Sequence, residues 1–349
     1  MAPQRVPIRS LLQHMVEHQA TDLYLSPTAP AKMTMQGAFV DATAAPLTDE
    51  DTIAYAKDLM KPGELDEFER EKEINLSYQF NNAARFRVNI YTQRDYVCLV
   101  IRRIAVQIPT LEELGLPPVV GHLALQERGM VLVTGATGSG KSTTVAAMID
   151  HRNATVGGHI ITIEDPIEFI HPNKLSLVSQ REVGIDTKSY HIALKNTLRQ
   201  APKVIYIGEV RDTDTMGFAL HAAETGHLVM ATLHSNNSYQ TLERILNFFE
   251  RDYHEQLLLQ LSLNLKAIIS QRLIPKVGGG RAAALEIMLN TPTIAELVQK
   301  GDIRGVRGAI AAGAKQGLQT FDMHLHHLWA NGVISEEEAF RNADSANNL

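Results

Sequence analysis

The stretch Gly135-Ala136-Thr137-Gly138-Ser139-Gly140-Lys141-Ser142 fits the phosphate-loop pattern G-x-x-x-x-G-K-[ST] at every constrained position. An apolar run at 130–133 precedes it, and a helix-like stretch at 143–149 follows it. Glycines let backbone N–H groups turn inward around an anion, and the start of a helix adds a partial positive charge. The order strand, loop, helix therefore predicts a phosphate-binding loop rather than a chance glycine-rich turn.

The loop also predicts a cofactor, ATP with Mg²⁺. We expect Lys141 to reach the β- and γ-phosphates and the Ser142 hydroxyl to ligate the metal ion. The expected nucleotide-binding residues are Gly135, Ala136, Thr137, Gly138, Ser139, Gly140, Lys141, Ser142 and Thr143.

Strands and helices alternate around the loop. Four apolar runs, at 130–134, 159–163, 204–207 and 228–232, are typical of strands buried on both faces of a mostly parallel sheet. Polar residues follow each run: the phosphate loop, then Glu164, then Glu209, then His234. Ligands of open parallel sheets bind beyond the carboxyl ends of the strands. The pattern therefore predicts one polar crevice at that edge.

Each polar residue has an expected role in ATP hydrolysis. Glu209 is expected to hold Mg²⁺ or its waters, and Glu164 to position or deprotonate the attacking water. Asp165 supports Mg²⁺ or orients Glu164, whereas Glu168 is expected to be structural. His234 suits contact with the γ-phosphate better than His227 does. The alternative for the carboxylates is a solvated strand end or a surface acidic turn.

The amino-acid composition limits the classes of protein to which this chain can belong. The chain has 349 residues, 44% apolar and 21% charged, which favours two globular domains. A net charge of −6 gives no support to a nucleic-acid partner. Cys98 is the only cysteine, so no internal disulfide or cysteine zinc site is expected, as suits a reducing cytosol. We see no signal peptide and no apolar run long enough to span a bilayer, so any membrane link must go through a partner.

The N-terminal third reads as a small α+β domain. Apolar residues at 8, 11, 12, 15 and 16 predict one helix, and alternation predicts strands at 22–25, 75–80, 85–91 and 98–101, with a turn at 81–84. Prolines mark a linker around 104–118, and the last sixty residues look helical, with Ser335 as a helix cap. The histidines at 324, 326 and 327 are attributed to helix packing rather than to a metal site.

Arginines of this first domain are candidates for the catalytic site. Hydrolysis needs positive charge on the transferring phosphoryl group, and another domain or subunit often supplies it. Arg85 and Arg87 lie two apart, hence on one strand face, and Arg102 is a third candidate. Arg94 and Arg103 are further candidates. The alternative is an ordinary charged outer face.

Taken together, these segments resemble the motor ATPases of the secretion superfamily, and specifically the type IV pilus retraction group (PilT/PilU). The similarity covers nearly the whole chain. The segments that carry it are 20–25, 85–89, the phosphate loop at 134–144, the acidic segment 162–168, 180–184, 198–212 and the histidine segment 225–235. A phosphate loop alone is unspecific, but this ordered set is highly specific.

The resemblance implies an α/β architecture of four parts. These are a PAS-like α+β domain at 1–105, a linker at 106–118, a RecA-like ATPase core at 119–289 and C-terminal helices at 290–349. It further implies a ring-shaped homohexamer that binds ATP between subunits, with arginines of one N-terminal domain reaching the neighbour. Such a motor is cytoplasmic and peripheral at the inner membrane, where it acts on the platform protein of the pilus machine.

Departures from the group point to one branch. Principal retraction motors carry Ala-Ile-Arg-Asn-Leu-Ile-Arg, where this chain has Thr-Ile-Ala-Glu-Leu-Val-Gln at 293–299. The group's Gln-Asp-Pro-Asp is Gln-Ala-Pro-Lys at 200–203, and the ending 341–349 resembles the PilU branch. That branch is an accessory retraction ATPase that supports the principal one. Two alternatives stay open: a nucleotide-gated scaffold with little hydrolysis, and a pilus assembly or type II secretion ATPase, which the single cysteine disfavours.

Overall fold

The computed structural model describes residues 5–35, 37–80, 84–104 and 107–345. Contacts divide the chain into two compact units. The first comprises residues 1–107 with 168–170, and the second comprises 108–167 with 171–349.

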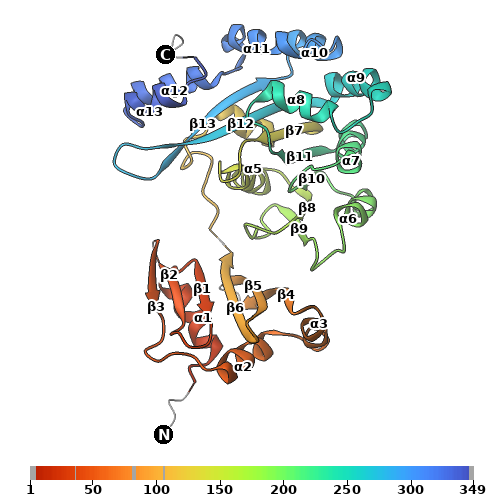
Figure 1. Ribbon diagram of the computed structural model, residues 1–349. Coiled ribbons are helices and arrows are strands. Elements are labelled where there is room, and N and C mark those ends of the chain that lie inside the picture. Colours follow the sequence, from red (N-terminus) through yellow and green to blue (C-terminus); the bar gives the residue numbers. More distant parts are fainter. Residues whose placement is uncertain (1–4, 36, 81–83, 105–106, 346–349) are drawn as a thin grey trace. The chain divides into compact units, whose positions relative to one another are not determined.

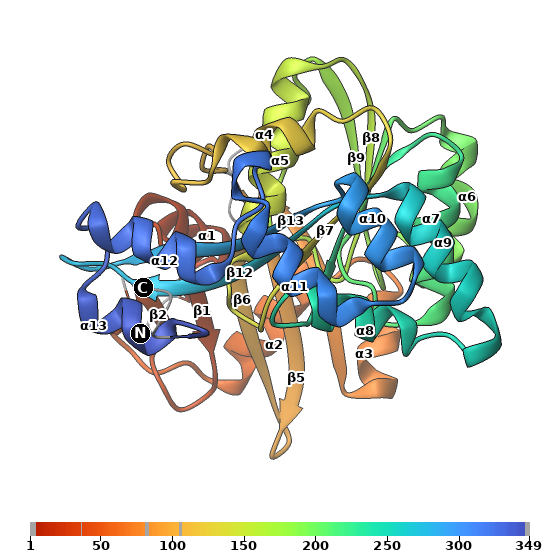
Figure 2. The ribbon, with the colours of Figure 1, turned by 90° about the horizontal axis from the view of Figure 1, so that it is seen from above.

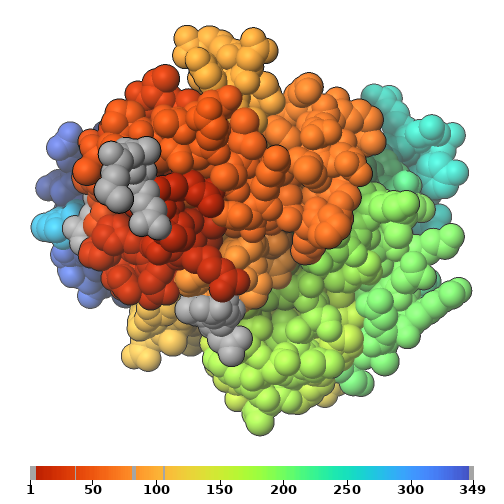
Figure 3. Space-filling model, turned by 90° about the horizontal axis from the view of Figure 1, so that it is seen from below, coloured from red at the N-terminus to blue at the C-terminus, as the bar shows by residue number. Residues whose placement is uncertain are grey.

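The first unit is built on an antiparallel sheet with strand order β3-β2-β1-β6-β5-β4. Figure 3 shows one face of the molecule, on which this unit is red to orange. The expected helix and the four expected strands are present, and the expected turn lies largely outside the described residues. The elements are α1 (Ile8–Glu17), β1 (Asp22–Leu25), β2 (Lys32–Met35), β3 (Ala38–Asp41), α2 (Asp49–Leu59), α3 (Glu64–Glu71), β4 (Glu73–Phe80), β5 (Ala84–Gln93) and β6 (Tyr96–Ile104).

Apolar periodicity explains how this unit packs. Helix α1 buries Ile8, Leu11, Leu12 and Met15, which recur at the spacing of one helix face, against the sheet. Strand β5 alternates between buried and half-buried residues, so one of its faces joins the same core. Its other face carries the arginines that the sequence singled out.

The second unit contains a sheet with strand order β13-β12-β7-β11-β10-β8-β9. All neighbouring pairs are parallel except β12 with β13. The four apolar runs are confirmed as strands β7, β8, β10 and β11. The sequence reading missed β9, β12 and β13. The strands are β7 (Gly129–Thr134), β8 (Gly158–Glu164), β9 (Ser176–Glu182), β10 (Val204–Ile207), β11 (Leu228–Leu233), β12 (Leu265–Pro275) and β13 (Arg281–Leu289).

Helices cover both faces of this sheet (Figures 1 and 2). Helices α4 and α5 pack on one face, and α6 to α11 pack on the other. Strands β7, β10 and β11 are buried along their whole length, which explains why they are mostly apolar. The helical elements here are α4 (Pro118–Ala124), α5 (Lys141–Thr155), α6 (Tyr190–Thr197), η1 (Leu198–Gln200), α7 (Thr213–Glu224), α8 (Ser238–Leu246), η2 (Arg251–Tyr253) and α9 (His254–Asn264).

The C-terminal region follows the β12–β13 hairpin, whose turn contains three glycines at positive φ, Gly278, Gly279 and Gly280. The last sixty residues are helical, as expected, and the Ser335 hydroxyl accepts a hydrogen bond from the backbone of Glu338. The remaining helices are α10 (Pro292–Gln299), α11 (Ile303–Ala312), η3 (Ala314–Gln316), α12 (Phe321–Ala330) and α13 (Glu336–Asn342). Within the described ranges, no helix has both the length and the apolar character to cross a bilayer.

Candidate nucleotide site

The sheet order places the expected polar segments at one edge. Strands β7, β11, β10 and β8 are consecutive neighbours and run parallel, so their carboxyl ends lie side by side. The phosphate loop follows β7, and Glu164 ends β8. Glu209 follows β10 closely, and His234 follows β11 directly. A ligand beyond this edge would therefore meet residues from four strands.

Two glycines of the phosphate loop are required by close packing. Gly135 has φ +151°, and a Cβ there would lie 2.4 Å from the Ser139 hydroxyl and 2.5 Å from the backbone oxygen of Gln271. Gly140 has φ +86°, and a Cβ there would lie 2.7 Å from the Gln271 side-chain nitrogen. The loop is thus wound tightly and held against β12, so its backbone N–H groups have a fixed geometry.

Lys141 is enclosed by the loop that precedes it. Its side chain is only 8% exposed, and Nζ donates hydrogen bonds to the carbonyls of Gly135 at 2.8 Å and Ala136 at 2.9 Å. Burial lowers the pKa of this ammonium, and the charge of Glu209 opposes that shift. The two residues therefore lie close enough to influence each other. A nearly buried ammonium at the start of a helix suits a polyanionic ligand.

Gln271 is a site residue that the sequence reading missed. It lies on β12, is 3% exposed, and its side-chain nitrogen donates to the carbonyl of Ser139 at 2.7 Å. Its side-chain oxygen accepts a hydrogen bond from the Thr144 hydroxyl at 2.7 Å. One amide therefore fastens the phosphate loop and the first turn of α5 to the neighbouring strand. No local motif marks it, because it lies far along the chain in a strand that was not predicted.

A pocket of about 240 Å³ opens beside the loop. It is lined by residues 135–139 together with Asn236, Gln271, Arg272, Leu273 and Arg281. The two arginines give the pocket a basic wall. Arg272 is also engaged by the C-terminal segment: it donates to the backbone oxygen of Asn342 at 2.8 Å and to Asp344 at 2.7 Å, and its guanidinium lies 3.9 Å from the centre of the Phe321 ring.

Glu209 and His234, both expected at the site, are in direct contact. His234 Nε2 lies 3.1 Å from one oxygen of Glu209, and Arg211 Nη2 lies 2.7 Å from the other. Burial alone would raise the pKa of Glu209, but the Arg211 hydrogen bond and the nearby charges of His234, Arg211 and Lys141 outweigh it, so the pKa is lowered. An ionised carboxylate here suits a hard divalent cation. Arg211 was not predicted, although it stands only two residues after Glu209.

Glu164 is held in place by two polar side chains. It is 6% exposed and accepts hydrogen bonds from the Thr162 hydroxyl at 2.6 Å and from the Gln180 amide at 3.2 Å. Gln180 lies opposite Thr162 on β9. Asp165, the next residue after Glu164, is exposed and lies 3.8 Å from Arg211. Arg211 thus faces both of the carboxylates that were expected to support Mg²⁺.

Close packing between strands requires a glycine at position 208. A Cβ there would lie 3.0 Å from the Tyr190 hydroxyl and 3.1 Å from the Cα of Glu164. Burial raises the pKa of Tyr190 strongly, so its phenol stays protonated. Gly208 therefore lets β10 approach the end of β8 and leaves room for Tyr190, a second residue that the sequence reading missed.

The candidate arginines lie in the first unit on one sheet face. Arg85 and Arg87 are two apart on β5, and Arg87 pairs across the sheet with Arg102 on β6. Arg102 donates to Asp22 at 2.7 Å, and a side-chain hydrogen bond from Arg85 reaches Ser77. The shared face of Arg85 and Arg87 is confirmed. Their action on a neighbouring subunit stays a prediction.

Two other histidines have structural partners. His227 contacts the carbonyl of Ala222 through Nδ1 at 3.1 Å. His324 is 4% exposed and its Nδ1 accepts a hydrogen bond from the backbone of Leu285 at 2.9 Å. Burial lowers the pKa of His324 to about 4. His326 and His327 are exposed, so the packing interpretation is confirmed for His324 alone.

A phosphate loop at the carboxyl edge of a parallel sheet, with an ionised carboxylate and a buried lysine beside it, defines a nucleotide-binding protein of the P-loop class. A family profile described as type II/IV secretion system protein matches residues 5–339, and the chain belongs to that family.

Relatives within the family are similar over nearly the full length. The chain is 48% identical to the type IV pilus ATPase PilU of Pseudomonas aeruginosa, covering 97% of this chain and 89% of that protein. It is 42% identical to the retraction ATPase PilT of the same organism, covering 98% and 99%. A crystal structure of the pilus retraction motor PilT with bound ADP superposes with a TM-score of 0.91 at 39% identity, covering 99% of both chains.

Proposed function

We propose that this chain is an ATP-hydrolysing motor of the type IV pilus machine that drives or assists pilus retraction. The observation that carries the proposal is the edge of the second sheet, where a phosphate loop with a buried Lys141 lies beside the ionised Glu209. The similarity to PilU and PilT over nearly the whole chain supports the choice of machine.

The site residues suit ATP with Mg²⁺. The loop backbone and Lys141 would bind the β- and γ-phosphates, and the exposed Ser142 hydroxyl would ligate the metal ion together with Glu209, supported by Asp165. Bound Mg²⁺ would neutralise charge that develops on the phosphates. The lowered pKa of Glu209 fits such a ligand set, because the carboxylate is ionised at neutral pH.

Hydrolysis would depend on Glu164 as the positioner or base of the attacking water. Two hydrogen bonds, from Thr162 and Gln180, restrict the orientation of this carboxylate. His234 would contact the γ-phosphate while it stays paired with Glu209. Positive charge on the transferring group would come in trans from Arg85, Arg87 and Arg102 of a neighbouring subunit in a homohexameric ring.

The partners follow from the same assignment. The ring would work in the cytoplasm, peripheral at the inner membrane, and act on the platform protein of the pilus machine. The higher identity to PilU than to PilT favours an accessory ATPase that supports a principal retraction motor. An ATPase assay of the purified protein with and without that motor, together with a measurement of particle mass, tests both the hexamer and the accessory role.

Two substitutions test the mechanism. Glu164→Gln should retain ATP binding and lose turnover by a factor of about 10² or more, because water is no longer activated. Lys141→Ala should lose both binding and turnover. Undiminished hydrolysis by Glu164→Gln would contradict its role. Pilus retraction that survives in cells carrying a Glu164→Gln protein shown to bind ATP without hydrolysing it would favour the nucleotide-gated scaffold instead.

A mixing experiment tests the arginines. Subunits with Lys141→Ala and subunits with both Arg85→Ala and Arg87→Ala should each be inactive alone. Mixed rings should recover part of the activity, since some interfaces then combine an intact lysine with intact arginines. If rings shown to contain both kinds of subunit stayed inactive, the arginines would not act in trans.

A further inference from the structure

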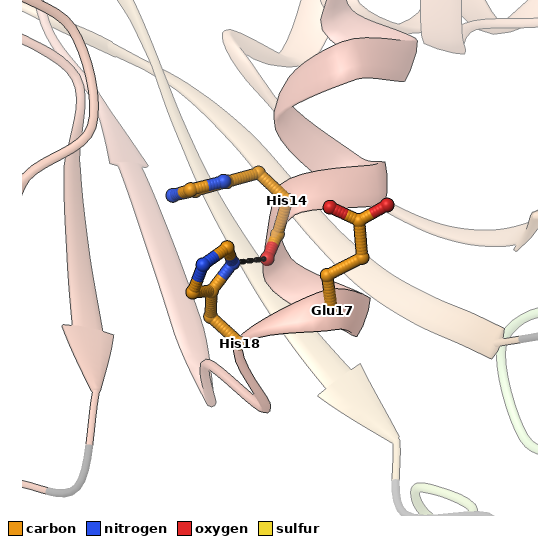
Figure 4. A group of neighbouring side chains, drawn as sticks. All are labelled: His14, Glu17 and His18. Carbon is orange, nitrogen blue, oxygen red and sulfur yellow. Dashed lines mark hydrogen bonds between the residues drawn. The ribbon is translucent and has the colours of Figure 1, made fainter.

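Three potential metal ligands meet at the end of helix α1, far along the chain from the nucleotide site. Figure 4 shows His14 and Glu17 on the last turn of this helix and His18 just after it, with the two imidazole rings side by side. One ligand atom from each lies within 4.8 Å of the other two. Within the described residues, no other set of three histidine, cysteine or acidic side chains meets that condition.

Helix geometry explains why these residues converge. Residues three and four apart lie on the same helix face, so positions 14, 17 and 18 are neighbours. The core-facing positions Ile8, Leu11, Leu12 and Met15 are buried, whereas Glu17 and His18 are exposed and His14 is half-buried. The group therefore lies at the surface, where an ion can reach it without disturbing the core.

The hydrogen bonds of the group leave a basic nitrogen available. His18 Nδ1 lies 3.1 Å from the carbonyl oxygen of His14, so Nδ1 carries the proton in the neutral ring and Nε2 carries the lone pair. A backbone carbonyl that fixes the tautomer in this way is the usual second partner of a metal-binding histidine. Gln13 donates to one oxygen of Glu17 at 2.8 Å, and the other oxygen can still act as a ligand.

We infer that His14, Glu17 and His18 form a surface binding site for a divalent transition-metal ion. Two imidazoles and one carboxylate are a ligand set that suits Zn²⁺ and Cu²⁺, with water completing the coordination. The ion joins residues 14 and 18, so it stabilises the last turn of α1. The ring centres of His14 and His18 lie 4.0 Å apart. The site is independent of ATP.

The test is metal binding by the full-length protein, without nucleotide and without an affinity tag. Zn²⁺ is titrated against a coloured competing chelator, and Cu²⁺ is titrated in a second series. We expect one Zn²⁺ per chain and tighter binding of Cu²⁺. His14→Ala and His18→Ala should each weaken Zn²⁺ binding at least tenfold, and Glu17→Gln should weaken it about threefold.

The matched control is the double variant His326→Ala/His327→Ala, which removes two exposed histidines from α12. It should bind Zn²⁺ as the wild type does. A thermal unfolding series gives a second readout: Zn²⁺ should raise the melting temperature of the wild type and of this control, but not of His14→Ala. The inference would be overturned if the wild-type protein bound no Zn²⁺. It would also be overturned if His18→Ala or Glu17→Gln bound Zn²⁺ with the affinity of the wild type.

Discussion

Replacing Gln271 by methionine should detach the phosphate loop from β12 while it preserves the volume of the side chain. Two hydrogen bonds of 2.7 Å are lost, one to the carbonyl of Ser139 and one from the hydroxyl of Thr144. Thr144 is 1% exposed, so its hydroxyl loses its partner without gaining water, at a cost of about 1–3 kcal/mol. Ser139, whose carbonyl loses the other bond, lines the pocket.

The two lost hydrogen bonds hold the phosphate loop in the shape that binds phosphate, so their loss should weaken ATP binding. Because 1.4 kcal/mol corresponds to a factor of ten, we expect ATP affinity to fall by about ten- to a hundredfold. Fluorescence binding of an ATP analogue measures it, and thermal unfolding checks that the protein is folded. In a double-mutant cycle, Thr144→Val should lower affinity on its own but have little further effect in Gln271→Met. Wild-type affinity in Gln271→Met, or strictly additive effects in the cycle, would refute the reasoning.

Three further outcomes are expected. Gly135→Ala should abolish ATP binding in a filter assay, because the new Cβ would lie 2.5 Å from a backbone oxygen that cannot rotate away; bound nucleotide at the wild-type level would contradict this. The pKa of His324 is about 4 when folded and 6.5 when unfolded, so only the unfolded ring takes up a proton between these values and stability falls as pH drops through that window. Between pH 7 and pH 5, His324→Gln should therefore lose about 2 kcal/mol less stability in urea unfolding than the wild type. Asp344→Ala should increase hydrogen exchange in α13 without altering unfolding of the first unit, because one partner of Arg272 is removed.

Local patterns predicted the four parallel strands and the loop at the centre of the candidate site, for physical reasons. A phosphate loop is a contiguous chemical device, and buried parallel strands are contiguous apolar runs, so both are visible along the chain. The order of the strands in the sheet, in contrast, cannot be predicted from any local pattern. It is the sheet that places Glu209 and His234 within 3.1 Å of each other, although the sequence had suggested each of them separately.

The missed elements lack such signals. Strand β9 contains polar residues and an exposed Leu177, since it lies at the sheet edge, so it has no continuous apolar run. Strand β12 follows α9 without a break, which hides its start. Gln271 and Tyr190 belong to the site through contacts between distant segments. Their roles depend on packing, which a single sequence does not display.

Two consecutive residues of strand β12 contact different parts of the chain. Gln271 binds the phosphate loop, and the next residue, Arg272, contacts Asn342, Asp344 and Phe321 while it also lines the pocket beside that loop. A single peptide unit thus separates the contact to the phosphate loop from the contacts to residues 342–344. Substitutions at Asn342 or Asp344 therefore have a short structural route to the phosphate loop, through Arg272 and its neighbour Gln271.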